Sequence, residues 1–478
     1  MHTHISAHFT THRDPHGGAV LFLIIAILLT GSMNANAETP AKSFSDTVET
    51  LCPVLAGLNA SGDLTAIQQD VLFRCGEVKI QSDQTFEDLT DEQLNALENM
   101  TSTQNSAMNT ATVEIARPQA TAITGRLASL RAGGVGGLAM NVQPVEREPV
   151  YYAGPVTSLS ADDTGTDMQT NFDRFGIFLN FNGATGSKDE TTNEAGFDFT
   201  SGGLVAGADY RFTPGFFLGL ALGYNQLASD INNDGGDVDV SGYGVSLYGT
   251  YYIENFYLNG IATYGRKDYK IKRKLDYSID RNPNDPNPSA TATVNQEFDG
   301  DTEADEYGFT LGAGYDLFFG GFSLGPYARL NYLRTKINGY DEELANNNAD
   351  DGFGLALSID DQDIESVSSI VGTQASYAIN SSVGVWSPYV KFDWQHEYQD
   401  DATELKASFA NAGSNPDVVA QNSIVIPLDS PDRDFFNLGF GLSATFAHGF
   451  PAFVDYATVL ALEDLTVHQI VGGLRIEL

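Results

Sequence analysis

Twelve stretches between residue 172 and the end of the chain alternate apolar with small or polar side chains, and the connections between them alternate in length. We expect strands at 172–184, 197–213, 216–229, 237–252, 256–273, 303–318, 322–337, 362–380, 384–400, 433–447, 450–460 and 466–478. Tight turns such as Thr213-Pro214-Gly215 follow the even-numbered strands, and polar connections, mostly long, follow the odd-numbered ones. A membrane barrel with up-and-down topology requires this alternation, because its turns are tight on one side and its loops long on the other. The predicted fold class is mostly β, a twelve-stranded antiparallel transmembrane β-barrel.

The run Phe216–Asn225 indicates which face of each strand meets which solvent. Leu218, Leu220 and Leu222 share one face, whereas the residues between them are small. A period of two places these two sets on opposite sides of a strand. Farther along, the stretch 388–398 confines its charged side chains to one face. Charges restricted to one face across several strands predict a polar lumen and an apolar surface toward lipid.

The first 37 residues resemble a targeting segment. An apolar run of eleven residues, Ala19–Leu29, precedes the A-x-A site Ala35-Asn36-Ala37. Such a run is too short for a transmembrane helix and typical of a secretory signal peptide. We predict cleavage after Ala37, with a short membrane anchor as the alternative. The formal charge of −38 argues against nucleic acid as a partner.

The region 38–89 is predicted to be a short helical unit clamped by its cysteines. Cys52 and Cys75 are the two cysteines of the chain, 23 residues apart, in an exported protein. Their spacing does not match a metal site, so we predict a disulfide, with two buried free thiols as the alternative.

A helical segment at 90–134 follows, and it contains a candidate helix for the barrel lumen. Thr90 and Gln93 fit a capping box, and a second helix is predicted between Pro118 and Gly133-Gly134. Its apolar face and its basic residues make it suitable for an acidic lumen: Arg117, Ile123, Arg126, Leu127, Leu130 and Arg131. An ordinary amphipathic surface helix is the alternative. Residues 135–171 are predicted to be a linker, rich in Gly, Pro, Ser and Asp, and 172–478 the barrel domain.

Both ends of the predicted barrel are similar to the translocator domain of autotransporters, the type V secretion family. The opening resemblance lies in GSKDETTNEAGFDFTSGGLVAGADYRFTPGFFLGLALGY (186–224), and the closing one in SPDRDFFNLGFGLSATFAHGFPAFVDYATVLALEDLTVHQIVGGLRIEL (430–478). The helix ending RLASLRAGG (126–134) resembles the segment that precedes such barrels. The resemblance implies a pore helix inside a twelve-stranded outer-membrane barrel, joined to a passenger outside the cell.

The resemblance also implies an assembly signal at the last strand, here Leu474, Ile476 and Leu478. Barrels of the family usually end on an aromatic residue, and this chain ends on leucine. The passenger is short, 38–117, and shows no solenoid repeat. Self-cleaving members commonly cut at an Asn pair in the pore helix. Since 90–134 contains no Asn-Asn, we expect the N-terminal region to stay attached.

The inventory of side chains argues against catalysis. The chain after residue 37 has three histidines, His396, His448 and His468, all in the barrel half, so we expect no enzyme and no cofactor. An outer-membrane phospholipase is the enzyme alternative. A weak calcium candidate is Asp234, Asp237 and Asp239, with a solvated loop as the alternative.

We therefore expect an outer-membrane barrel of a Gram-negative bacterium that translocates and displays its own short N-terminal region. The alternative is a structural or channel-forming barrel whose N-terminal region stays in the periplasm. Expected partners are outer-membrane lipid and lipopolysaccharide, the barrel-assembly machinery and periplasmic chaperones, with the protein itself a monomer.

Overall fold

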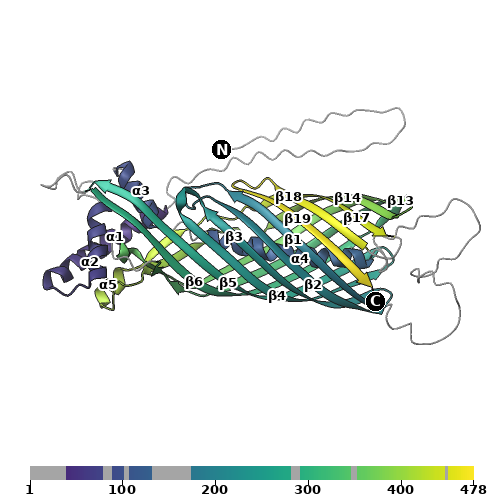
Figure 1. Ribbon diagram of the computed structural model, residues 1–478, viewed down its shortest axis with the longest axis horizontal. Coiled ribbons are helices and arrows are strands. Elements are labelled where there is room, and N and C mark those ends of the chain that lie inside the picture. The colour runs from purple at the N-terminus through teal and green to yellow at the C-terminus, as the bar shows by residue number, and fades with distance from the viewer. Residues whose placement is uncertain are drawn as a thin grey trace, which may run out of the picture. The chain divides into compact units, whose positions relative to one another are not determined.

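The computed structural model describes residues 39–78, 89–101, 107–131, 174–280, 291–345, 352–446 and 451–477. Twelve long strands form a closed antiparallel barrel in which each strand pairs with the next, and β1 pairs with β19 to close the sheet (Figure 1). The strands are β1 Phe175–Lys188, β2 Phe197–Thr213, β3 Phe216–Ile231, β4 Gly236–Ile253, β5 Phe256–Asp280, β6 Thr291–Tyr315, β8 Phe322–Ile337, β12 Gln362–Tyr377, β14 Gly384–Glu397, β17 Asp434–Phe446, β18 Pro451–Leu460 and β19 Leu465–Glu477. Short strands at the turns extend β6 and β12: β7 Leu317–Phe319 and β13 Ile379–Ser381. The predicted strand number and topology are confirmed.

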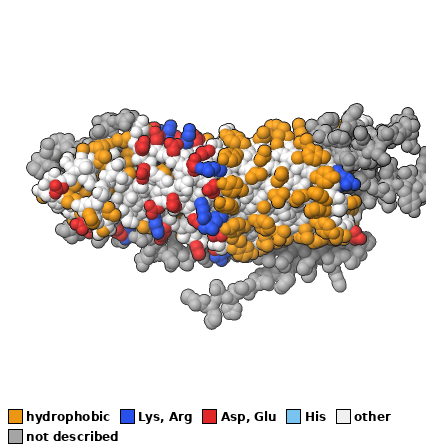
Figure 2. Space-filling model, turned by 90° about the horizontal axis from the view of Figure 1, so that it is seen from below, with side chains coloured by type: hydrophobic (Ala, Val, Ile, Leu, Met, Phe, Trp, Pro, Cys, Tyr) orange, Lys and Arg blue, Asp and Glu red, His pale blue; other side chains and the backbone are white. Residues whose placement is uncertain are grey.

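The two faces of the strands separate as the sequence predicted. On β3, Leu220 and Leu222 point outward with 59% and 67% of their surface exposed, while Phe217 and Ala221 are buried toward the lumen. On the face seen in Figure 2, hydrophobic side chains gather in a band across the barrel, and acidic and basic side chains gather beside it. The tight turns lie at one end of the barrel, here the turn end, and the longer connections lie at the other, the loop end. In the described parts of the chain, no helix has the length and apolarity needed to cross a membrane.

The predicted loop at 274–302 is wrong over most of its length, because β5 and β6 continue far beyond the band. Inward-facing side chains at Leu275, Tyr277 and Ile279 are almost fully buried. On the outer face, basic residues of β5 lie opposite acidic residues of β6, as in the pairs Lys270↔Asp301 and Lys272↔Asp299. Opposite charges across a strand pair stabilise the ladder. The polar stretch that resembled a loop thus belongs to a hairpin, and its acidic residues Asp299 and Asp301 lie on the outer face of that hairpin.

The loop end also carries elements that the sequence did not reveal. A small sheet has the order β16-β15-β11-β9, and a helix α5 lies in the same region. The elements are β9 Tyr340–Asp341, β10 Glu343–Leu344, η5 Phe353–Leu355, β11 Leu357–Ile359, β15 Glu404–Phe409, α5 Pro416–Gln421 and β16 Ile424–Pro427. The described residues of the connections 338–361 and 401–432 are therefore folded rather than plain loops.

The N-terminal region is helical, as predicted: α1 Pro40–Ser61, α2 Ala66–Val78, α3 Asp91–Met100 and α4 Ala107–Arg131. Cys52 and Cys75 form the predicted disulfide between α1 and α2. The capping box is confirmed, because the Thr90 hydroxyl accepts from the Gln93 amide and the Gln93 side chain accepts from the Thr90 amide. Ala37 and the predicted linker 135–171 lie outside the described residues.

The predicted start of α4 at Pro118 is wrong. The helix begins at Ala107 and Pro118 lies inside it. An interior proline removes one helical hydrogen bond, a cost that tertiary contacts must offset. Those contacts are present, because Lys267 and Tyr269 of β5 both bind Thr112, in the part of the helix that precedes the proline.

The disulfide generates a first prediction. Replacing both cysteines by alanine should lower the free energy of unfolding of the α1–α2 pair by about 3 kcal/mol, the chain entropy of a loop of this length. Thermolysin digestion of the purified protein should then remove α1 and α2 faster while leaving the barrel intact. Equal digestion rates in the wild type and the C52A/C75A variant would contradict the prediction.

Candidate functional site in the lumen and at its loop end

The helix α4 lies inside the barrel, against one part of its wall (Figure 1). Its apolar face is formed by Ile123, Leu127 and Leu130, each at most 1% exposed. These side chains form one hydrophobic cluster with Phe178, Val205, Phe217, Ala221, Tyr248 and Ile261 of β1–β5. The predicted pore helix is therefore present, and its apolar stripe packs on the first five strands.

A buried ion pair fixes the helix to β2. Arg126 donates from Nε and Nη2 to the two carboxylate oxygens of Asp209, each at 2.6 Å, and both side chains are 2% exposed. Tyr248 donates a further hydrogen bond to Asp209 at 2.9 Å, and the guanidinium lies over the Phe178 ring. The bidentate geometry satisfies both carboxylate oxygens of Asp209 in a site that excludes water.

A groove of glycines receives the middle of the helix. Gly223 and Gly244 are paired neighbours on β3 and β4, and both face the Gln119 side chain. A Cβ at Gly244 would lie 2.7 Å from Gln119 Oε1, and one at Gly223 would also collide with this side chain. Gln119 in turn donates to Ser246 Oγ at 2.8 Å. The absence of side chains here lets the helix approach the wall closely.

The first half of α4 is held by polar groups of β5 and β6. Lys267 Nζ donates to the Thr112 carbonyl at 3.0 Å and forms an ion pair with Glu306. The hydroxyls of Thr112 and Tyr269 lie 2.7 Å apart. Arg117, the other predicted cation whose side chain is described, lies 3.2 Å from Glu114 and over the Phe435 ring. The side chain of Arg131, the remaining predicted cation, lies outside the described part of the structure.

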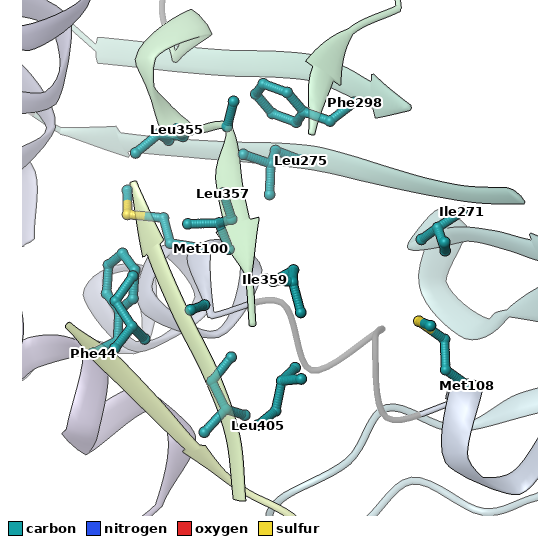
Figure 3. Close-up of a cluster of buried hydrophobic side chains, with 14 of the residues drawn as sticks. Phe44, Met100, Met108, Ile271, Leu275, Phe298, Leu355, Leu357, Ile359 and Leu405 are labelled. Atoms are coloured by element: carbon teal, nitrogen blue, oxygen red, sulfur yellow. The ribbon is translucent and has the colours of Figure 1, made fainter. Parts of the chain in front are cut away.

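At the loop end, the N-terminal helices and the folded connections share one hydrophobic core. We call this unit the cap: α1, α2 and α3 together with the described residues of 338–361 and 401–432. Figure 3 shows Phe44 and Met100 of the helices beside Leu357 and Leu405 of the connections, with Leu275 from the extended β5. The Phe44 and Phe409 rings meet edge to face, with centroids 5.8 Å apart. The N-terminal helices therefore do not form a separate domain.

Polar contacts fix the same interface. Asp70 of α2 accepts hydrogen bonds from the amides of Gly352 and Gly354, at 3.1 and 2.8 Å. The Thr47 hydroxyl donates to the Ser423 carbonyl at 2.7 Å, and Gln68 donates to the Ala412 carbonyl at 2.5 Å. Both connections are thus bound by side chains of α1 and α2.

A second buried ion pair joins the barrel strand β5 to the connection 338–361 of the cap. Arg273 of β5, fully buried, donates to Glu342 at 2.8 Å from Nε and to the Leu355 carbonyl at the same distance. Glu342 also accepts from the Leu357 amide. On α3, burial and the neighbouring carboxylate of Glu190, from the β1–β2 connection, raise the pKa of Glu98. Charged groups of β5, of α3 and of two connections therefore lie at the boundary between the cap and the barrel.

A cavity of about 940 Å³ lies between α4 and the far wall of the barrel. The face of α4 that lines it is polar or small, for example Thr121, Thr124, Gly125 and Ala128. The opposite wall comes from β6, β8, β12, β14, β17 and β18. Lys391 and Asp393 are among its lining, and both belong to the stretch 388–398 whose charged face was predicted to meet the lumen. The predicted polar lumen is confirmed on these strands.

The structure does not group the calcium candidates. Asp234, Asp237 and Asp239 form no metal-binding group, nor do other described His, Cys, Asp or Glu residues. Asp234 instead accepts from Lys274 at 2.8 Å. Asp237 and Asp239 lie in β4, opposite Lys272 and Lys270 of β5. The acids form the β4 side of the charge ladder, because the predicted loop is only the tight turn η4 Asn232–Asp234.

The remaining predicted residues lie on the barrel wall. His396 is 2.8 Å from Asp434, and His468 is 2.9 Å from the Tyr456 hydroxyl. Leu474 points outward on β19, and Ile476 pairs with Ile177 in the closing ladder. The assembly signal stays a prediction. Leu478 and His448 lie outside the described residues.

Sequence reasoning missed the partners of the pore helix. Asp209, Tyr248 and Lys267 stand at inward positions of strands that were read correctly, so their orientation was available from the period of two. Which residues of α4 they contact could not be predicted. The strand pattern and the helix pattern do not specify how deep the helix lies in the barrel or how it is rotated.

Residues 177–457 match the family model described as "Autotransporter beta-domain". Among curated proteins, the chain is 25% identical over 252 residues to the esterase EstA of Pseudomonas aeruginosa, covering 51% of this chain and 35% of that protein. It is 21% identical over 310 residues to the protein YaiT of Escherichia coli, covering 63% of this chain and 27% of that one. The chain thus spans about a third of the length of the curated relatives it matches.

Solved structures show the same kind of likeness at low identity. The translocator domain of the autotransporter NalP from Neisseria meningitidis is 12% identical, with a TM-score of 0.46, over 66% of this chain and 90% of that one. The beta domain of the Bordetella autotransporter BrkA is 17% identical, with a TM-score of 0.42, over 64% of this chain and all of that one.

The buried pair generates a second prediction. Replacing Arg126 by methionine leaves the Asp209 carboxylate buried without its partner, which should lower the free energy of unfolding by about 3–5 kcal/mol. Urea titration in detergent micelles measures the change. The double variant R126M/D209N should lose less stability than the sum of the two single variants, and strict additivity would contradict the coupling.

The glycine groove generates a third prediction. A leucine at Gly223 must displace Gln119, and we expect a loss of about 1–3 kcal/mol from overpacking. Gly260 on β5 is the matched control, because a Cβ there meets nothing within 4 Å. Urea midpoints should fall for G223L and stay unchanged for G260L. Equal midpoints for the two variants would show that α4 does not occupy the groove.

Proposed function

The chain belongs to the autotransporter family, and from this premise we propose that it carries its own N-terminal helices through its barrel and holds them outside as a fixed cap. The barrel is an outer-membrane barrel, whose tight turns face the periplasm and whose long connections face outward. The loop end is therefore the outer end, and the cap lies at the cell surface.

The course of the chain through the barrel is the observation that carries this proposal. The helices α1–α3 pack on the loop end, α4 lies in the lumen, and β1 begins with Phe175 at the turn end. A barrel inserts from the periplasmic side, so the residues before α4 must cross to reach the loop end. The alternative in which this region remains in the periplasm requires it on the opposite side of the barrel.

The shared core favours retention over release. Phe44, Leu51 and Leu55 of α1 are at most 1% exposed, and their neighbours include side chains from the connections of the barrel. A unit of this size has too small a core to be stable alone, even with one disulfide. Release would expose apolar surface on both sides of the interface, at a cost of about 25 cal/mol for each Å² uncovered.

Display rather than catalysis is the function proposed for the cap. The match to the protein named as an esterase covers 252 residues, which is 51% of this chain and 35% of that protein. A match of this extent is too short to assign the esterase activity to this chain. The region before the barrel contains no histidine after residue 37. The same proposal includes outer-membrane lipid, lipopolysaccharide and the barrel-assembly machinery as partners of the barrel.

An engineered protease site tests this proposal. A tobacco etch virus protease site inserted between Gly62 and Asp63 lies between α1 and α2, and the disulfide spans it. Protease added to intact cells should cut this site. The two fragments should separate on a denaturing gel only after reduction.

The matched control is the same site inserted at Gly320 and Gly321, in the turn between β7 and β8. This site should resist protease on intact cells and become accessible once the outer membrane is permeabilised. If the α1–α2 site also required permeabilisation, the N-terminal region would lie in the periplasm and the proposal would be overturned.

A further inference from the structure

Three polar side chains stand in one row on the outer face of the barrel. The register pairs Ser369 of β12 with His396 of β14, and the same His396 with Asp434 of β17. The residue next to each of them is buried on the lumen side, so the three face outward: Ser368, Glu397 and Phe435. Side chains directly opposite in an antiparallel pair have Cβ atoms about 4.5–5.5 Å apart. A serine, a histidine and a carboxylate thus follow one another across three neighbouring strands, with the histidine in the middle.

The histidine ring is held in one orientation. His396 Nδ1 lies 2.8 Å from Asp434 Oδ1, and Trp394 donates to the same oxygen from Nε1 at 2.9 Å. A carboxylate accepts hydrogen bonds, so this contact places the proton of the neutral ring on Nδ1. The ring centroid is 5.8 Å from that of Trp394 and 4.7 Å from that of Tyr398. Nε2 is thereby the accepting nitrogen, the arrangement in which a histidine acts as general base toward a serine.

The serine is within reach of a further donor. Ser369 Oγ lies 3.1 Å from the Tyr398 hydroxyl. A change of rotamer turns Oγ away from that hydroxyl and toward the histidine on the opposite strand. Catalytic hydrogen bonds of this kind are often loose before substrate binds and tighten in the complex. The Tyr398 hydroxyl then donates to the oxygen of a substrate carbonyl, which is the role of an oxyanion donor.

The row lies at the loop-end border of the apolar band. The outward residues that precede the histidine on β14 are large and apolar, each at least 40% exposed: Val390, Phe392 and Trp394. Past the end of β14, Asp400 forms an ion pair with Arg433. Lipid ester groups lie at this depth of a bilayer, between the acyl chains and the headgroups. The bilayer therefore brings acyl esters to the side of Ser369.

We propose that this row is an esterase site on the barrel wall, with an acyl ester of an outer-membrane lipid as its substrate. Ser369 Oγ attacks the ester carbonyl carbon while His396 Nε2 takes the hydroxyl proton, and the carbonyl electron pair moves onto its oxygen. The C–O bond to the lipid alcohol then breaks, and His396 returns the proton to that alcohol. Water, deprotonated by His396, attacks the acyl-serine and releases a fatty acid and free Ser369. Ester and water thus become carboxylic acid and alcohol.

Asp434 is a positioning residue in this site, because it acts on the substrate only through the histidine ring. The sequence did not reveal the row, since its members belong to three strands that only the register brings together. The site belongs to the wall of the barrel, so the display proposed for the cap does not depend on it.

A fluorophosphonate probe tests the nucleophile on full-length protein in detergent micelles. Attack of Oγ on its phosphorus expels fluoride, and peptide mass spectrometry should place the stable adduct on Ser369. Labelling should be lost in S369A and fall about a hundredfold or more in H396Q, because the general base is gone. The matched control is H468Q, which should label as the wild type does. His468 also faces outward and contacts Tyr456, but threonines stand opposite it on both neighbouring strands.

Release of fatty acid identifies the ester. Phospholipid mixed micelles and purified lipopolysaccharide are offered separately, and the lipid that is hydrolysed is the source of the substrate. The variant D434N should lower kcat about a hundredfold with KM unchanged, and D434E should restore part of the loss, as expected of a residue that orients the base.

Three results would overturn the proposal in protein whose heat-modifiability shows that it is folded. The first is the absence of an adduct on Ser369, and the second is equal turnover by S369A and the wild type. The third is labelling of Ser369 without release of fatty acid from either lipid.

Discussion

The sheet closes on itself, and a barrel in lipid could not exist without this closure. Lipid offers no hydrogen bonds, so each backbone amide and carbonyl in the membrane must find its partner within the sheet. The pairing of β1 with β19, from Gly176↔Glu477 to Lys188↔Leu465, removes the last two free edges. A closed ring of twelve strands also encloses a lumen, and the side chains at every second position must be accommodated there. The buried Asp209 shows how this is done, because Arg126 arrives on a helix from outside the sheet to neutralise it.

The same helix determines what happens at the outer end. Because α4 packs on β1–β5, the residues that precede it in the chain lie beside the extended β5–β6 hairpin, whose inner face is apolar. Met108, near the start of α4, already belongs to the core of the cap. The lumen and the cap are therefore continuous along the chain, and the anchoring of one positions the other. Asymmetric docking of the helix is also what leaves the cavity along the far wall.

Much of the barrel could be predicted from the sequence, because each strand carries its own evidence in a local period of two. Leu220 and Leu222 faced outward as expected, and the disulfide and the Thr90 capping box formed as the residue types indicated. The errors arose where local rules were overridden from a distance. Proline is common in the first turn of a helix, so Pro118 was read as a helix start. The helix instead begins at Ala107, and the part before the proline is held by the contacts of Thr112 with β5. The polar stretch after Lys274 resembled a loop because its apolar partners are in the N-terminal helices, almost two hundred residues away.

Hydrogen exchange tests whether the N-terminal helices and the outer connections form one folded unit. The amides of β15 and β16 should be compared in full-length protein and in a variant lacking residues 39–101, both in nanodiscs. If the core is shared, these amides exchange slowly in the full-length protein and much faster in the deletion variant, while amides of β3 and β4 within the barrel band are unchanged. Equal protection of β15 and β16 in both proteins would show that the connections fold without the helices and that the core is not shared.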